Sequence, residues 1–211
     1  MSSNGAVIQN SCDAIIEISK GSNLKYEISK ESNLLRLDRV LHTSMFYPGN
    51  YGYFPNTIAG DGDPLDVLVL TDYSLHPGII VECKIIGVLL TVDEKGTDEK
   101  IIAVPSDKVD KSYKRINDIN DIPKLTLDKI EHFFSNYKSL EYNKWVKTDG
   151  FKNSKFAWDI YKKAKEDYLE DVLNSSIDYI LRNSNAYSYK LTTNIKMNQS
   201  EIETLKETFW P

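Results

Sequence analysis

The chain is poor in cysteine and histidine. Its 211 residues include two cysteines, Cys12 and Cys83, and three histidines. The cysteines form no C-x-x-C pair, and the histidines show neither H-x-H nor H-E-x-x-H spacing, which argues against a disulfide framework and the usual zinc motifs. We therefore expect two reduced thiols, as in proteins of a reducing compartment.

Long apolar runs, leader signals and excess positive charge are also missing. No segment approaches the roughly 20 apolar residues that a membrane helix needs. The first residues, MSSNGAVIQNSCD, have neither the basic nor the apolar region of a secretory signal, and no arginine precedes Arg36. The net charge of −5 opposes binding to nucleic acid or to anionic membranes. These features predict a cytoplasmic protein that binds no nucleic acid and no membrane.

Short strand-like segments dominate the first half of the chain, and Gly, Pro and Asn turn signals separate them. The segments are AIIEI (14–18), LKYEI (24–28), LLRLDRVL (34–41), PLDVLVL (64–70), VECKIIGVLLTV (81–92) and KIIAVP (100–105). Many short strands without helices between them favour a small sandwich or barrel.

The pattern becomes helical from about Thr126, and a second helical segment begins near Ser154. Ser200 and Glu203 have the spacing of a capping box, which predicts a last helix over 200–209. We expect a flexible N-terminus over 1–12, one domain over 13–170, and a helical C-terminal extension over 171–211 that packs on the same domain.

Charged residues share faces with apolar residues in three of the predicted strands, because alternate side chains of a strand point to opposite sides. These residues are Glu17, Arg39 and Asp66; in a fourth strand, LKYEI, Lys25 and Glu27 share one face while Leu24, Tyr26 and Ile28 share the other. Each one alone can reach water at a strand end. Taken together they predict a polar pocket at one end of the sheet, since a charge on an apolar face costs free energy unless it is paired or binds an ion.

The segment DGDPLD places Asp61, Asp63 and Asp66 within six residues, directly before a strand. Gly62 and Pro64 break the regular alternation and allow the three carboxylates to surround one centre. An EF-hand loop is excluded because its glycine is missing and a strand follows. By spacing alone, a site for a hard divalent cation and a simple Asp-rich turn are equally good interpretations.

A second acidic segment, TVDEKGTDEKII, favours the metal site. A hairpin closing at Gly96 would bring Asp93 near Asp98, with Lys100 two residues further on. Alone it is typical of a solvated hairpin tip. Beside the DGDPLD turn, it would give two or more metal ions a floor of carboxylates, an arrangement that suits phosphoryl chemistry.

Several segments together resemble the soluble family I inorganic pyrophosphatases. DGDPLD matches the family signature D-x-D-P-x-D. The other matching segments are IIEI (15–18), KYEI (25–28), LDR (37–39), MFYPGNYGY (45–53), DEKGTDEK (93–100) and HFFSNYKSLE (132–141). The resemblance covers roughly residues 13–170 and is nearest to the bacterial-type core. It implies an α+β, mainly β fold: a closed five-stranded OB-like barrel with flanking helices.

The resemblance also implies hydrolysis of pyrophosphate to two orthophosphates by a metal-activated water. The implied metal ligands are Asp61, Asp66, Asp93, Asp98 and Glu27, with Glu17 acting mainly through metal-bound water. Asp63 would be the general base. The implied phosphate-binding residues are Lys25, Arg39, Tyr51, Lys100, Tyr137 and Lys138, and Tyr47 would line the site. By helical spacing alone, Tyr137 would be interpreted as a packed core tyrosine, and only the resemblance assigns it to the site.

The implied cofactor is Mg²⁺, several ions per site, with Mn²⁺ or Zn²⁺ as possible substitutes. A homo-oligomer is implied, with a hexamer favoured and a dimer or trimer as alternatives. The chain departs from the family at Gly49, which is often cysteine there, and in about 40 residues after Glu170. A nucleic-acid-binding barrel and a non-catalytic relative remain as alternatives; the acidic balance opposes the first, and the presence of every implied carboxylate opposes the second.

Overall fold

A long central strand organises the sheet of this protein. The structure, a computed structural model, describes residues 11–29 and 31–183, with side-chain surroundings as far as residue 177. Its strands are β1 (Cys12–Ile18), β2 (Leu24–Ile28), β3 (Leu35–Val40), β4 (Asn50–Tyr53), β5 (Asp66–Val69), β6 (Ile80–Asp93), β7 (Gly96–Thr97), β8 (Lys100–Pro105) and β9 (Val146–Asn153). Its helices are η1 (Lys111–Tyr113), η2 (Ile119–Asp121), α1 (Lys124–Asn136) and α2 (Ser154–Asn183).

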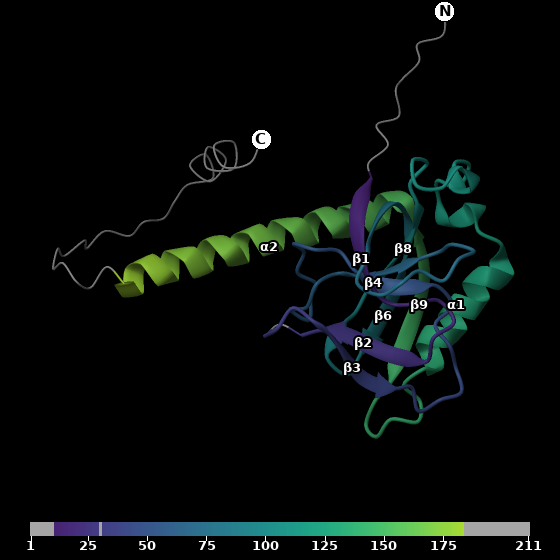
Figure 1. The fold of residues 1–211 in the computed structure, drawn as a ribbon, viewed down its shortest axis with the longest axis horizontal. Helices are drawn as coiled ribbons and strands as arrows, with labels where there is room; N and C mark the ends of the chain where they lie inside the picture. The colour runs from purple at the N-terminus through teal and green to yellow at the C-terminus, as the bar shows by residue number, and fades with distance from the viewer. Residues whose placement is uncertain (1–10, 30, 184–211) are drawn as a thin grey trace, which may run out of the picture. The chain divides into compact units, whose positions relative to one another are not determined.

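Seven strands form the main sheet, and β2 and β3 form a separate antiparallel pair (Figure 1). The order of the main sheet is β1-β4-β5-β8-β6-β7, with β9 also on β6 and a further pairing between β1 and β6. Among the strands that the structure describes, β5 and β8 are the one parallel pair. All six residues of β8 are buried, which is typical of a strand covered on both faces.

Gly52 lets β4 lie unusually close to β1. A Cβ atom at this position would be 1.8 Å from the carbonyl oxygen of Ile15, a distance that no side chain can tolerate. Glycine is therefore required at this point in the pairing of β1 with β4.

Two apolar cores flank the sheet, and each contacts a different helix. The first contains Ala157 and Ala164 of α2, together with inward side chains of β1, β5, β6 and β8. The second contains Ile130, Phe133 and Phe134 of α1. The prediction of a mainly β protein with helices packed outside is confirmed.

The polar strand β9 was not predicted, because VKTDGFKN has no apolar alternation. The prediction that Tyr137 and Lys138 lie on the first helix needs correction. Helix α1 begins at Lys124 and ends at Asn136, so that Tyr137 is its C-cap and Lys138 lies in the following turn. Helix α2 begins at Ser154, as predicted, and continues past residue 170 to Asn183.

The chain divides into two compact units, residues 1–172 and 173–211. The predicted helix over 200–209, and most of the predicted N-terminal and C-terminal segments, lie outside the described residues. The packing of the extension on the domain therefore stays a prediction.

Candidate active site

A cavity of about 480 Å³ opens on the first unit between the β2–β3 pair and the main sheet. Nine carboxylates and six cationic side chains line it. The carboxylates are Glu17, Glu27, Asp38, Asp61, Asp63, Asp66, Asp93, Glu94 and Asp98, and the cations are Lys25, Arg39, Lys95, Lys100, Lys138 and Lys144. The five charged residues that predicted a polar pocket, Glu17, Lys25, Glu27, Arg39 and Asp66, all line this cavity.

The turn before β5 brings Asp61, Asp63 and Asp66 to the same cavity. Gly62 has φ +83° at its tip, a conformation that favours glycine. Asp61 accepts a hydrogen bond from the backbone N–H of Asp63 at 3.0 Å, and the carbonyl of Asp63 accepts one from Ala59 at 2.8 Å. The turn is therefore an ordered part of the cavity wall.

The hairpin between β6 and β8 forms the adjoining wall. Asp93 pairs with Gly96 across the hairpin, and the N–H of Asp98 bonds to the carbonyl of Thr91 at 2.9 Å. The two acidic turns meet directly, because a Cβ atom on Gly60 would lie 2.7 Å from the hydroxyl of Thr97. Two segments distant in sequence, 61–66 and 93–98, thus place carboxylates at one cavity.

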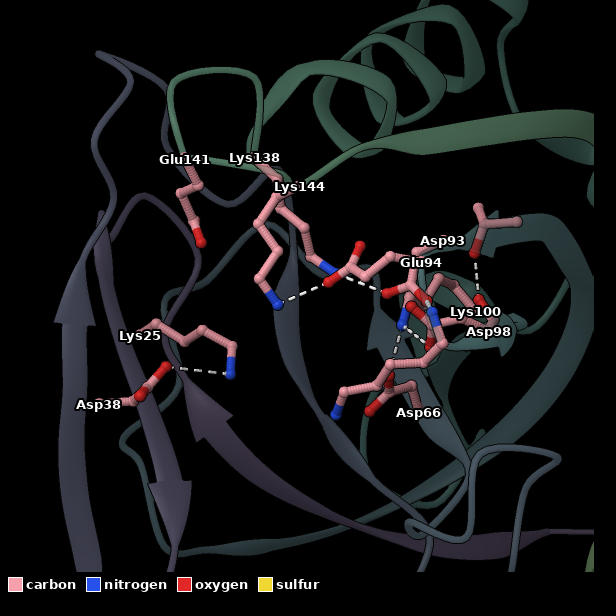
Figure 2. Close-up of polar contacts among 12 residues, drawn as sticks. Lys25, Asp38, Asp66, Asp93, Glu94, Asp98, Lys100, Lys138, Glu141 and Lys144 are labelled. Carbon is pink, nitrogen blue, oxygen red and sulfur yellow. Dashed lines mark hydrogen bonds and ion pairs between the residues drawn. The ribbon is translucent and has the colours of Figure 1, made fainter.

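Buried lysines pair with these carboxylates (Figure 2). Lys100 Nζ lies 2.5 Å from Asp66 Oδ2 and also bonds Asp98, while Lys138 Nζ lies 2.7 Å from Asp93 Oδ2. Burial opposes the charge of Lys100, but its two carboxylate partners raise its pKa above the usual value. Burial and the neighbouring Asp66 raise the pKa of Asp98 despite Lys100.

The pKa values of Asp93 and Glu17 shift in opposite directions. Burial raises the pKa of Asp93, but the hydrogen bonds from Lys138 and the backbone of Lys95 outweigh it, so the pKa is lowered overall. Glu17 is 9% exposed, and burial raises its pKa to about 7 although it accepts a hydrogen bond from the N–H of Ile28 at 2.8 Å. The negative charge of Asp66 raises the pKa of Glu17 further.

The β2–β3 pair carries the other group of charges. Lys25 contacts Glu27 on its own strand and lies 3.4 Å from Asp38 on β3. Arg39 bonds Asp38 and, through Nε, Glu141 at 2.9 Å. The cavity therefore has cations on both sides of its carboxylate floor.

Among the three tyrosines of the predicted site, Tyr51 and Tyr137 line the cavity and Tyr47 is not part of the lining. Tyr47 is buried behind them, with its ring centroid 5.4 Å from that of Tyr51 and 4.8 Å from that of Phe133. Burial raises the pKa of all three phenols well above its usual value. Their hydroxyls are therefore protonated at neutral pH and able to donate hydrogen bonds.

The donor set suits hard divalent cations, because every candidate ligand is a carboxylate oxygen. Within the described residues, no three carboxylate, histidine or cysteine groups stand close enough to hold one ion. Lys100 pairs with Asp66 and Asp98, and Lys138 pairs with Asp93. The carboxylate oxygens of these residues fit a divalent cation in their chemistry, and an ion would meet the paired lysines as competitors for them.

Sequence reasoning missed several lining residues, including Tyr53, Glu94, Lys95 and Lys144. Glu94 and Lys95 belong to the hairpin segment DEKG and could have been included from their position. Lys144 follows an irregular turn and carries no sequence signal that places it at the cavity.

Comparison with known proteins agrees with this fold. The model of the family described as inorganic pyrophosphatase matches residues 14–169. The inorganic pyrophosphatase of Campylobacter jejuni is 50% identical over 161 residues, covering 76% of this chain and 94% of that protein. The solved Helicobacter pylori inorganic pyrophosphatase has a TM-score of 0.75 and 50% identity, over 76% of this chain and 95% of that one. The Thermus thermophilus structure has a TM-score of 0.73 and 40% identity, over 80% and 96%.

The fold and cavity define a protein that gathers carboxylates and cations around a small polar site. More particularly, the chain belongs to the inorganic pyrophosphatase family. Membership of this family implies dependence on divalent metal ions. None of the described helices is both long and apolar enough to span a membrane.

Proposed function

We propose that this protein hydrolyses inorganic pyrophosphate to two orthophosphates and that Mg²⁺ is its principal cofactor. The observation that carries the proposal is the convergence of the Asp61–Asp66 and Asp93–Asp98 turns on one cavity that also contains lysine and arginine side chains. An acidic site binds a densely anionic substrate only if cations neutralise it, and this cavity has both fixed cations and ligands for more.

Asp61, Asp66 and Asp98 would hold the first ion, with Asp66 shared with a second. Asp93 would join Asp98 in holding a third, and Glu27 would serve a fourth. Glu17 would act through water on these ions. When bound, the ions neutralise substrate charge and lower the pKa of the attacking water. Mn²⁺ or Zn²⁺ are possible substitutes, because carboxylate ligands alone do not select strictly among these ions.

In the reaction, a water oxygen forms a bond to one phosphorus as the bridging P–O bond breaks. Asp63 accepts a proton from that water, and the leaving phosphate keeps the bridging oxygen and gains a proton, so that one water and one pyrophosphate yield two hydrogen phosphates. The phosphate-binding groups Lys25, Arg39, Tyr51, Lys100, Tyr137 and Lys138 stabilise the charge that develops on the leaving group. Tyr47 would support the site from behind Tyr51.

We further propose that the main sheet closes into a five-stranded OB-like barrel. The support is the set of pairings β1–β4, β4–β5, β5–β8, β8–β6 and β6–β1, which returns to its starting strand. A cytoplasmic homo-oligomer, favoured as a hexamer, and packing of residues 171–211 on the domain belong to the same proposal. Size measurements on the full chain and on a variant ending at residue 172 test the last two points.

The decisive test of the function is phosphate release from pyrophosphate in Mg²⁺ and in excess chelator. We expect rapid turnover that disappears with chelator and returns when Mg²⁺ is restored. Folded protein that is saturated with Mg²⁺ and releases no phosphate would refute the proposal. Tripolyphosphate and ATP as alternative substrates would show whether the site is restricted to the two-phosphate anion.

A further inference from the structure

The turn after α1, residues 137–145, is joined by ion pairs to both sides of the cavity. Lys138 Nζ lies 2.7 Å from Asp93 Oδ2, and Lys144 Nζ lies 2.5 Å from Glu94 Oε1, so both lysines attach the turn to the end of β6. Figure 2 shows Lys138, Glu141 and Lys144 arising from this one segment beside the cavity. The segment is therefore fixed at two points on one side.

Glu141 connects the same turn to the opposite side. Its Oε1 accepts a hydrogen bond from Arg39 Nε at 2.9 Å, across 102 positions of the sequence. Its side chain is only 9% exposed. Its backbone is held as well, because its N–H bonds to the carbonyl of Lys138 at 2.9 Å and its carbonyl accepts from the N–H of Lys144 at 3.3 Å. Glu141 thus presents its carboxylate from an ordered position between the two anchored lysines.

The hydrogen bond from Arg39 Nε to Glu141 fixes one edge of the planar guanidinium group. A guanidinium carries five N–H donors in a rigid fork, so an acceptor on Nε sets the plane in which the other nitrogens lie. Asp38 occupies Nη1. Asp38 is a weaker constraint than Glu141, since it is 33% exposed and is shared with Lys25. Nη2 carries two further N–H groups, one beside the Nε–H and the other on the end edge that it shares with Nη1.

We propose that Glu141 is a positioning residue that orients the guanidinium of Arg39 toward the phosphate of the substrate. Glu141 does not line the cavity, whereas Arg39 does, so Glu141 acts through Arg39. The inference rests on the proposed function, because it assigns Arg39 to phosphate binding. A charge-assisted hydrogen bond that holds the fork in one plane reduces the ordering that substrate binding would otherwise require.

The test compares Glu141→Ala and Glu141→Gln in the full-length protein, with KM and kcat for magnesium pyrophosphate and the thermal midpoint as readouts. Glutamine keeps an oxygen that can accept from Nε, and alanine does not. We expect E141A to raise KM about tenfold, as the loss of one oriented charge-assisted bond predicts. We expect E141Q to stay within about threefold of the wild type. If E141A lowers the thermal midpoint by more than about 5 °C, Glu141→Met, which keeps the side-chain volume, replaces it.

The same substitution in an Arg39→Lys variant distinguishes a role in positioning Arg39 from a role in general stability. Lysine at position 39 lacks the fork, so in Arg39→Lys the further change Glu141→Ala should have almost no additional effect on KM. Glu82→Ala is the matched control, because Glu82 pairs with Lys108 at 3.2 Å and neither residue lines the cavity. It should leave KM unchanged.

The outcomes separate the two proposals. Wild-type protein that does not hydrolyse pyrophosphate refutes the proposed function. Active wild type with an unchanged KM in E141A refutes the role of Glu141 alone. An equal effect of E141A in the wild-type and Arg39→Lys backgrounds also refutes it, because Glu141 would then act independently of Arg39.

Discussion

Lys100 Nζ lies 2.5 Å from Asp66 Oδ2 in the candidate active site, on a side chain that is 3% exposed. The same lysine also bonds Asp98, so one buried ammonium joins β5 to the hairpin before β8. Asp66 and Asp98 are also the proposed shared ligands of the metal ions. The carboxylates therefore have two possible partners, and metal binding must compete with Lys100 or share Asp66 with it.

Asp66→Asn should abolish most activity without unfolding the protein. The amide keeps an oxygen toward Lys100, and Asp98 still neutralises that lysine, but a neutral amide is a poor ligand for two divalent ions. We expect phosphate release to fall by at least about 10²-fold, the scale on which single electrostatic groups act in active sites. Circular dichroism should show unchanged secondary structure.

Asp107→Asn is the matched control for that variant. Asp107 pairs with Lys84 at 3.0 Å and is not part of the cavity lining. It should keep nearly full activity. Equal loss in both variants would mean that charge removal in general, and not the loss of Asp66, reduces turnover.

Asn50→Ala should destabilise the fold because this fully buried amide joins three segments. Its oxygen accepts from the N–H of Lys20 at 3.0 Å and of Leu75 at 2.8 Å, and its nitrogen donates to the carbonyl of Tyr73 at 3.0 Å. Loss of all three leaves partly buried backbone groups without these partners. We expect the free energy of unfolding in urea to fall by about 2–4 kcal/mol.

Asn136→Ala provides the comparison for Asn50. Asn136 makes one exposed side-chain hydrogen bond, to the carbonyl of His132 at 2.8 Å. Its loss should change the free energy of unfolding by less than about 1 kcal/mol. Similar losses in the two variants would contradict the structural importance given to the buried amide.

Asp118 should contribute stability that disappears in acid. It accepts hydrogen bonds from the N–H of Ser154 at 2.9 Å and of Asn120 at 3.2 Å, at the starts of α2 and η2. Burial raises the pKa of Asp118, but these bonds outweigh burial and lower it overall. A lowered folded-state pKa means that the contribution is present above the unfolded-state pKa and is lost as pH falls through the folded-state pKa.

The measurement is urea unfolding of wild type and Asp118→Asn at pH 7 and across the acid range. At pH 7 the wild type should be more stable by about 1 kcal/mol. The difference should shrink below about pH 4, where aspartate begins to protonate. A difference that stays constant or grows in acid would have the wrong sign for a carboxylate that is ionised in the folded state.

Both cysteines should be unreactive in the folded protein. Cys12 and Cys83 face each other on β1 and β6 with sulfur atoms 3.8 Å apart, and they are 7% and 0% exposed. The hydrogen bond with Cys12 and burial raise the pKa of Cys83 well above its usual value, which disfavours the reactive thiolate. Ellman's reagent should detect no thiol in native protein and two in denaturant. Rapid labelling without denaturant would contradict the packing of β1 on β6.

The two acidic turns of the candidate site could be predicted from the sequence, whereas the ion pairs that join distant segments around it could not. The Asp61–Asp66 turn and the hairpin at Gly96 were predictable because glycine and aspartate spacing determines local backbone shape. Glu141 and Lys144 lie in an irregular turn, and their partners Arg39 and Glu94 are distant in sequence, so no periodicity indicates these pairs. Strand β9 was missed because its half-exposed polar residues are held by pairing with β6 and not by an apolar pattern.

Tyr137 shows the same limit at a single residue. Its spacing relative to Ile130 and Phe134 is that of a core residue, and its ring does stack on Phe133 at 5.2 Å. It also lines the cavity, because the helix ends at Asn136 and the chain turns there. A residue can therefore belong to the core and to the site at once, and a helical period cannot separate the two.

The central claim is that the two acidic turns hold metal ions together. The most direct measurement is anomalous X-ray diffraction from crystals soaked in Mn²⁺, a substitute for Mg²⁺ that can be located by its anomalous signal. The account predicts peaks between Asp61, Asp66 and Asp98. Mn²⁺ peaks only outside the cavity, or none at saturating Mn²⁺, would contradict it.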